Sequence, residues 1–287
     1  MPVTFNCPYC QMKIEADGEL AGTRASCPNC EKDLTIPSPR LGTGDQLAGF
    51  SIKQWLGSGA MGEVYLANQI TMDREVALKV LASSAIKSQE DVDRFMHEVR
   101  MLAKLDHPNI VTAFEAGQHD GHHYLAMTFV NGETLDDKLR RQGPLAEKEV
   151  LGVGLKVARA LGYAWDRNQL LHRDIKPSNI MIDQAGEVKL MDLGISKSLA
   201  EDHSMTKTGL VVGTPWYMSP EQAQGHEVAR QTDMYSLGAT LYHLLTGHPP
   251  FDGPTTMAIL TKLLTEDVKP AREWRPEISQ GANDLLL

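Results

Sequence analysis

Cysteine is missing from residue 31 to the end of this 287-residue chain, although four cysteines stand before that point. The first residues lack the basic start and apolar run of a secretory signal, and no apolar stretch approaches the ~20 residues that cross a bilayer. These absences argue against a secreted protein held by disulfides and against a membrane segment in this chain. We expect the chain to be cytoplasmic, with any membrane anchor lying downstream of residue 287.

An excess of basic residues is absent as well. The chain has 28 Lys and Arg against 37 Asp and Glu, a formal net charge of −9. Proteins that mainly bind nucleic acid are usually basic, so we expect no nucleic-acid partner. With 42% hydrophobic and 23% charged residues, the composition is that of a soluble globular protein. The length suits one large domain and a small one.

The four cysteines form two C-x-x-C pairs, Cys7 with Cys10 and Cys27 with Cys30, which are separated by the segment 11–26. Two such knuckles supply the four sulfurs of a tetrahedral metal site, and the spacing is that of a zinc ribbon. Because so short a module has little core, the metal would supply most of its folding energy. The sequence predicts structural Zn²⁺, with iron in a rubredoxin-like site as the alternative. The module could dock a protein partner.

The chain divides into a zinc ribbon over residues 1–36, a linker over 37–49 and a main domain over 50–287. The linker is rich in Pro and Gly and has no apolar periodicity. No internal repeat is evident. Apolar patterns in the main domain predict strands at 50–56, 63–68, 76–80, 110–116 and 123–130, and helices at 90–105, 146–167 and 232–246. We therefore expect an α+β domain with a strand-rich N-terminal lobe and a helical C-terminal lobe.

A glycine-rich motif occupies residues 57–64, which read G-S-G-A-M-G-E-V and fit G-x-G-x-x-G-x-V. The dinucleotide-binding fingerprint shares these glycines, but there they open a helix. Here a strand-like run follows, so the loop joins two strands. Glycines in such a loop let backbone amides close over phosphates with no Cβ in the way. This motif alone leaves a simple hairpin turn as the alternative.

A lysine and a glutamate stand beside apolar runs. Lys79 lies on the apolar strand at 76–80, and Glu98, further along the chain, borders the apolar stripe of the helix at 90–105. Each would be costly if buried alone and tolerable as a pair. We expect Glu98 to hold Lys79 where it reaches the α- and β-phosphates of a nucleotide. A surface lysine on an edge strand is the alternative.

The most specific run is residues 172–179, H-R-D-I-K-P-S-N, which has the protein-kinase catalytic-loop form. Asp174 would accept the proton of a substrate hydroxyl, and Lys176 would neutralise charge on the transferring phosphoryl group. Asn179 would hold Mg²⁺. Asp192, which begins D-L-G in the place of D-F-G, would bind Mg²⁺ that bridges the β- and γ-phosphates.

In this order and spacing, the motifs of residues 50–287 resemble a eukaryotic-like protein kinase of the bacterial serine/threonine type. The resemblance implies a two-lobed fold that transfers the γ-phosphoryl group of ATP to Ser or Thr hydroxyls of protein substrates. Lys176 and residues 213–221, G-T-P-W-Y-M-S-P-E, are similar to the serine/threonine form of the family. The resemblance also implies an ATP site formed by Leu56, Gly57, Ser58, Gly59, Ala60, Met61, Gly62, Val64, Ala77, Lys79, Met127, Phe129, Val130 and Met181.

The resemblance also implies a mode of control. A phosphate on Thr206 or Thr208 would pair with Arg173 and order the substrate platform; threonines that are merely exposed are the alternative. Thr214 is expected to bond to the catalytic loop, and Asp233 to brace that loop.

The end of the chain departs from the family. It stops early in a helix, which predicts a C-terminally truncated domain without the arginine that would pair with Glu221. We therefore expect Glu221 to be buried and unpaired. A pseudokinase that binds nucleotide as a scaffold is the rival function.

Overall fold

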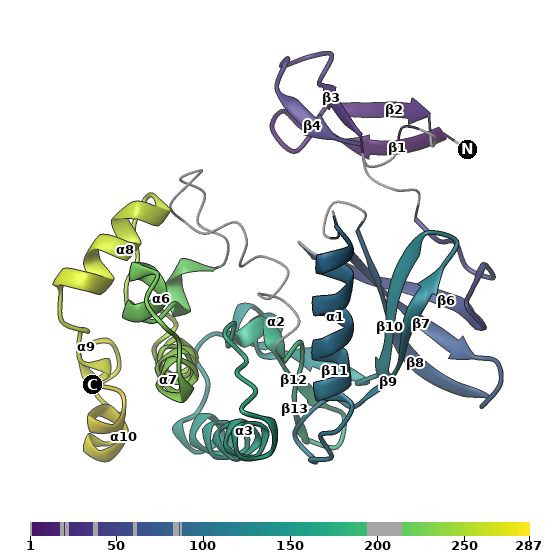
Figure 1. Ribbon diagram of the computed structural model, residues 1–287. Coiled ribbons are helices and arrows are strands. Elements are labelled where there is room, and N and C mark those ends of the chain that lie inside the picture. The colour runs from purple at the N-terminus through teal and green to yellow at the C-terminus, as the bar shows by residue number, and fades with distance from the viewer. Residues whose placement is uncertain are drawn as a thin grey trace. The chain divides into compact units, whose positions relative to one another are not determined.

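The computed structural model describes residues 2–17, 20, 23–36, 40–59, 62–82, 86, 88–193 and 214–287 (Figure 1). The backbone forms two compact units, residues 1–93 with 113–129 and residues 94–112 with 130–287. Across the described parts of the chain, no helix combines the length and apolar character needed to span a membrane.

Two small hairpins form the cysteine module. Strand β1 (Pro2–Asn6) pairs antiparallel with β2 (Lys13–Asp17), and β3 (Arg24–Ser26) with β4 (Asp33–Thr35). The first cysteine of each knuckle donates its N–H to a carbonyl just past the knuckle, Cys7 to Met12 at 2.8 Å and Cys27 to Lys32 at 3.0 Å.

The residue after each knuckle also has the same backbone conformation. Gln11 and Glu31 both adopt a left-handed conformation, with φ of 62° and 57°. The cysteine module thus contains the same turn twice. The sequence analysis did not predict this short repeat.

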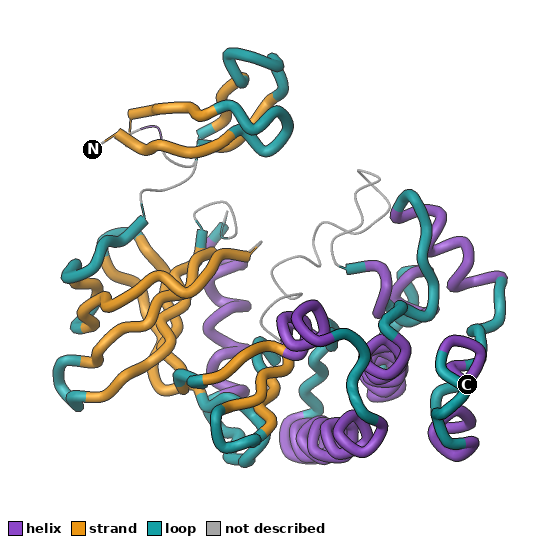
Figure 2. Tube along the Cα trace, turned by 180° about the vertical axis from the view of Figure 1, so that it is seen from behind, coloured by secondary structure: helices purple, strands orange, loops and turns teal. Residues whose placement is uncertain are grey.

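A six-stranded antiparallel sheet makes up the rest of the first unit, in the order β5-β6-β7-β8-β10-β9. Figure 2 shows its strands as orange tubes. Its aromatic and aliphatic core includes Phe50, Ile52, Tyr65 and Leu78. The strands are β5 (Gln46–Leu47), β6 (Phe50–Gly59), β7 (Gly62–Gln69), β8 (Arg74–Leu81), β9 (Ala113–His119) and β10 (His122–Thr128).

The predicted linker, 37–49, differs from the structure in its second half. Residues of β5 pair with β6, Gln46 opposite Ser51, and the Leu47 side chain is buried in the sheet's core. The sheet therefore begins before residue 50. A strand of two residues is too short to give an apolar alternation, so the sequence showed only the glycines and prolines around it.

The second unit is mainly helical and holds a three-stranded sheet, β11-β12-β13. Helix α3 packs against α7, and Gly154 of α3 lies so close to Leu241 that an added Cβ would be 2.7 Å from that side chain. The strands are β11 (Gly132–Thr134), β12 (Ile180–Asp183) and β13 (Val188–Leu190). The helices are α2 (Leu135–Gln142), α3 (Glu147–Asn168), α6 (Pro220–Gln224), α7 (Arg230–Thr246), α8 (Thr256–Thr265), α9 (Ala271–Trp274) and α10 (Gln280–Leu285).

Helix α1 (Gln89–Leu102) belongs to both units: residues 89–93 are part of the first unit, and residues 94–102 are part of the second. Its buried residues, Phe95, Val99 and Leu102, have the helical spacing that the pattern at 90–105 predicts. The strand-rich N-terminal region and the helical C-terminal region confirm the expected fold class. The long predicted helices at 146–167 and 232–246 are observed at 147–168 and 230–246.

Candidate active site

Asp233 of α7 holds the backbone of the catalytic loop. Its buried carboxylate accepts the N–H of His172 on Oδ2 at 2.8 Å and the N–H of Arg173 on Oδ1 at 2.7 Å. Arg173 has a φ of 65°, a region that non-glycine residues rarely adopt. Two charge-assisted hydrogen bonds to one carboxylate stabilise this strained turn.

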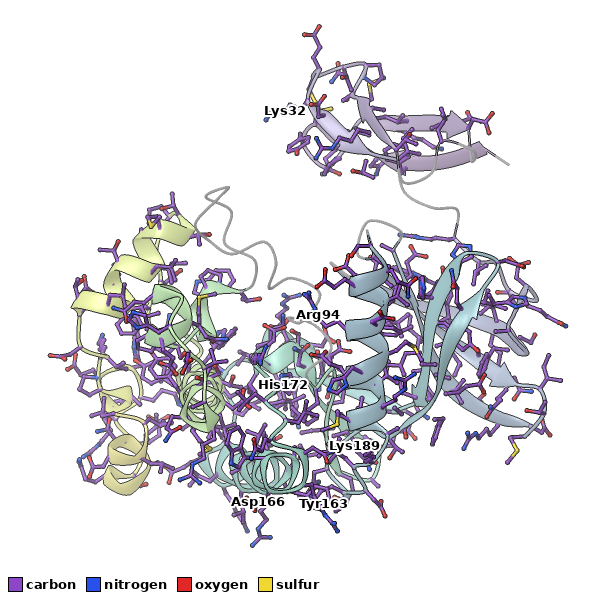
Figure 3. The ribbon with its side chains drawn as sticks, viewed as in Figure 1. Lys32, Arg94, Tyr163, Asp166, His172 and Lys189 are labelled. Carbon is purple, nitrogen blue, oxygen red and sulfur yellow. The ribbon has the colours of Figure 1, made fainter. Side chains whose placement is uncertain are left out.

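The His172 side chain ties the loop to the segment that carries Asp192. His172, which is labelled in Figure 3, is fully buried. The Asp174 N–H donates to Nδ1 at 3.3 Å, so the ring proton lies on Nε2, which donates to the Met191 carbonyl at 2.8 Å. The next residue, Asp192, has a φ of 52°. The buried imidazole thus fixes the chain on both sides of the candidate site.

The Asp174 carboxylate lies beside a cation and an amide. Lys176 Nζ donates to Asp174 Oδ2 at 2.7 Å, and Asn179 Nδ2 donates to the same oxygen at 3.1 Å and to the Asp174 carbonyl at 2.7 Å. Both side-chain contacts fall on Oδ2, so Oδ1 is the oxygen that can accept a hydrogen bond from a substrate hydroxyl. Lys176 Nζ also lies 3.5 Å from Thr214 Oγ1.

Asn179 and Asp192 offer oxygen ligands for a cation. The Met191 N–H donates to the Asn179 carbonyl at 2.9 Å, which brings the segment before Asp192 beside Asn179. Because the Asn179 amide nitrogen donates to Asp174, its side-chain carbonyl oxygen is the atom left for a metal. Carboxylate and amide oxygens are the donors that Mg²⁺ prefers. The donor set fits Mg²⁺.

Several residues predicted to bind ATP share one face of the first unit's sheet. Val64 lies directly opposite both Gly57 and Lys79, and Met127 lies opposite Ala77. Directly opposed residues in antiparallel strands project from the same face, as do residues two apart on one strand. Lys79 is only 6% exposed. A buried lysine argues against the surface-lysine alternative.

The glycines of the motif have different roles in the fold. Gly62 has a φ of 146°, and an added Cβ there would lie 2.0 Å from the Val80 carbonyl oxygen. The fold therefore requires glycine at this position. At Gly57 and Gly59, by contrast, an added Cβ would meet no atom of the described residues within 4 Å. The fold does not require glycine there, and the open space suits the close approach of a phosphate group.

The remaining residues of the predicted ATP site and phosphorylation sites are divided between the two units, or lie outside the described residues. Phe129 belongs to the first unit, whereas Glu98, Val130 and Met181 belong to the second. The pairing of Glu98 with Lys79 stays a prediction. Ala60, Met61, Thr206 and Thr208 lie outside the described residues. Leu56 and Ser58 lie on β6.

The prediction that Glu221 is buried and unpaired was wrong. Glu221 is half-buried, and its Oε1 accepts a hydrogen bond from Thr232 Oγ1 at 2.5 Å. Partial burial alone would raise the pKa of Glu221, but hydrogen bonds from Thr232, its own backbone amide and Ser219 lower it below the ordinary value. Thr232 gave no signal in the sequence, because its contact depends on how α6 and α7 pack.

Gln222 is a further residue that sequence reasoning missed. Its Nε2 donates to the Arg173 carbonyl at 3.0 Å, while its Oε1 accepts the Ser219 N–H at 3.2 Å. One amide thus caps the start of α6 and contacts the catalytic loop. Only its position relative to Ser219, the spacing of a capping box, could have identified it.

The four cysteine sulfurs gather at one point. All four Sγ atoms lie within 4.8 Å of one another, and the Cys7–Cys30 and Cys10–Cys27 pairs are each 3.7 Å apart. None forms a disulfide. Four sulfurs about 2.3 Å from a central zinc would be separated by about 3.8 Å, the edge of the tetrahedron. The observed separations fit such a site.

Two of these thiols, Cys10 and Cys27, have a lowered pKa, which favours the ionised, metal-binding form. A hydrogen bond from the Asn29 side chain and another from the Met12 backbone lower the pKa of Cys10 to about 6. Asn29 belongs to the second knuckle and Cys10 to the first, so the two turns support each other. Thiolate is the form of cysteine that binds metal.

Comparison with known proteins agrees with this geometry. Solved structures of the Mycobacterium tuberculosis PknI kinase domain are similar to this chain. One of them has a TM-score of 0.68 and 31% sequence identity, and the match covers 86% of this chain and 90% of that structure. The fold and site define a protein kinase domain. The protein kinase domain family matches residues 50–287, and the chain belongs to this family.

Two curated relatives come from bacteria. The chain is 39% identical over 245 residues to serine/threonine-protein kinase PrkC of Bacillus subtilis (strain 168), a match that covers 85% of this chain and 38% of PrkC. It is 37% identical over 236 residues to serine/threonine-protein kinase PknB of Mycobacterium leprae (strain TN), which covers 81% of this chain and 38% of PknB. The chain thus spans well under half the length of these relatives.

Proposed function

We propose that this chain is a serine/threonine protein kinase that transfers the γ-phosphoryl group of ATP to hydroxyl groups of protein substrates. The observation that carries the proposal is the Asp174 carboxylate, with Lys176 at 2.7 Å and Asn179 at 3.1 Å on the same oxygen. Asp233 and His172 hold the loop that presents this arrangement. The bacterial relatives named serine/threonine-protein kinases support the same reaction and acceptor class.

Each residue has a distinct part in the reaction. Asp174 Oδ1 accepts the hydroxyl proton of the substrate as the oxygen–phosphorus bond forms and the bond to the β-phosphate breaks. Lys176 donates to Asp174 Oδ2 and would neutralise charge on the transferring group. Lys79 anchors the nucleotide's phosphates, and Asn179 with Asp192 would hold Mg²⁺. Bound ATP supplies the phosphoryl group, and Mg²⁺ neutralises its negative charge.

The proposed reaction is tested by removing its base. Wild-type protein should transfer radiolabelled phosphate from γ-labelled ATP to itself or to an added protein. Asp174→Asn should lower this transfer by ~10²-fold or more, because a positioned base contributes about that much. Asp166→Asn, at an exposed position on α3 (Figure 3), is the matched control and should keep wild-type activity. Wild-type protein that binds ATP without any transfer would instead be a scaffold.

We further propose that the cysteine cluster holds one structural Zn²⁺. Elemental analysis of protein purified without added metal should give zinc near one equivalent per chain. Cys27→Ser should lower that content, because it removes one of four buried or half-buried thiolate ligands. Tyr9→Phe, at an exposed position in the first knuckle, should not. Iron in place of zinc, or a metal-free protein with intact disulfides, would contradict the proposal.

The cysteine module also bears on the partner and the location of this chain. We propose that the cysteine module offers a surface to a protein partner, and that the chain works in the cytoplasm. The four cysteines form no disulfide, as is usual for proteins of a reducing compartment.

A further inference from the structure

The hairpin that carries the glycine motif has a contact from outside its own strands. Arg40 lies in the segment that joins the cysteine module to the sheet. Its guanidinium carbon lies 4.4 Å from the centre of the Trp55 ring, and its Nε donates to Glu63 Oε1 at 2.8 Å. Trp55 is on β6, and Glu63 is on β7 directly after Gly62. One side chain therefore contacts both strands of the hairpin.

Tyr65 holds the other oxygen of Glu63. Its hydroxyl donates to Glu63 Oε2 and accepts the Leu41 N–H at 3.2 Å. The Tyr65 side chain is only 1% exposed, so its hydroxyl has little access to water as an alternative partner. Both oxygens of Glu63 are thus fixed, one by Arg40 and one by Tyr65, and Tyr65 also binds the backbone next to Arg40.

These contacts lie beside the last described residue pairs of the hairpin. Glu63 stands opposite Ser58, and Gly62 stands opposite Gly59. Among the described residues, an added Cβ at Gly57 or Gly59 would meet nothing within 4 Å, so no packed side chain fixes these two positions. In the described part of the hairpin, the side chain directly after Gly62 is that of Glu63, so its contacts bear on the conformation next to the glycines.

We propose that Arg40 is a positioning residue for ATP: through Glu63 and Trp55 it holds residues 55–59 and 62–63 of the glycine hairpin in the conformation that binds the phosphates. This inference rests on the proposed function. It makes the segment after the cysteine module a support of the nucleotide site, which acts through Glu63 and Trp55. Exposed ion pairs are individually weak, and a stacked guanidinium adds a comparable contribution. The expected effect is therefore a change in affinity of a few fold.

The test uses point variants of the full chain. Arg40→Ala should raise KM for ATP about threefold to fivefold and leave kcat within twofold, since the catalytic loop is untouched. Arg40→Lys should restore part of the affinity, because lysine keeps the charge and loses the planar stack on Trp55. Lys53→Ala is the matched control. It removes an exposed ion pair of similar length, Lys53 to Glu75 at 2.9 Å on the same sheet, and should leave KM unchanged.

Two further measurements separate positioning from a merely structural role. Glu63→Gln should raise KM for ATP by a similar factor. The double variant Arg40→Ala, Glu63→Gln should have the same KM as either single variant, because both substitutions remove one contact. In hydrogen exchange without nucleotide, the amides from Trp55 to Gly59 should exchange faster in Arg40→Ala than in Lys53→Ala.

A wild-type KM and wild-type exchange in Arg40→Ala would overturn the inference and leave the proposed function standing. A chain without phosphoryl transfer would contradict the proposed function instead. ATP affinity measured by calorimetry, together with the exchange rates, would then still decide the role of Arg40.

Discussion

Asp192→Ala and Lys79→Met should each lower turnover by ~10²-fold or more while the domain stays folded, since preorganised charge is usually the largest catalytic contribution. Asp192→Ala removes a magnesium ligand, and Lys79→Met removes the phosphate anchor. Methionine keeps the unbranched apolar stem that lysine buries on β8, so the sheet should keep its packing. Steady-state phosphorylation of an added protein and thermal unfolding, measured on the same preparations, separate loss of chemistry from loss of fold.

The matched controls are Asp166→Ala and Lys104→Met, which change the same residue types at exposed positions. Both should keep wild-type turnover. An Asp192→Ala or Lys79→Met variant that retained half of the wild-type activity would show that the motifs have been assigned to the wrong residues.

Asp233→Asn should damage both stability and activity. The amide has the same shape, but its Nδ2 cannot accept a hydrogen bond, so the buried N–H of His172 or Arg173 loses its acceptor. Loss of a buried, charged hydrogen bond should lower the free energy of unfolding by about 2–3 kcal/mol. The left-handed turn at Arg173 would then relax, and we expect turnover to fall by ~10²-fold, since misplaced catalytic groups cost about that much.

Urea unfolding and kcat measured on Asp233→Asn test this expectation. The exposed Asp166→Asn is again the control, because it removes the same charge without a buried partner. A change in unfolding free energy below about 0.5 kcal/mol, typical of surface substitutions, together with normal kcat would mean that the hydrogen bonds to Asp233 do not hold the loop.

Motifs in which the chemistry dictates both residue type and spacing could be predicted from the sequence. The two C-x-x-C pairs, the glycine motif and the run at 172–179 are of this kind, since a metal, a phosphate or a phosphoryl group requires those residues at those distances. Family resemblance added Asp233, which lies so far along the chain from Asp174 that no local pattern connects the two.

Contacts that depend on strand register or helix packing could not be predicted. The contacts of Arg40 with Trp55 and Glu63 depend on how β6 pairs with β7, where Ser58 lies opposite Glu63. This register cannot be derived from the sequence. Glu221 was expected to lack a partner because the expected partner was an arginine outside this sequence. The structure shows that Thr232 donates a hydrogen bond to Glu221 instead. The repeated C-P-x-C turn is visible in the sequence. It is much shorter than the 20–50-residue repeats that are typical of repeat folds, so it did not indicate an internal repeat.

Identification of the phosphorylated residue tests the central claim most directly. Wild-type protein and Asp174→Asn should be incubated with ATP, Mg²⁺ and a protein acceptor, and the phosphate should then be located by mass spectrometry. The account predicts phosphate on Ser or Thr with the wild-type protein and at most a trace with Asp174→Asn. Phosphate confined to Tyr or His, or an equal amount with both proteins, would contradict it.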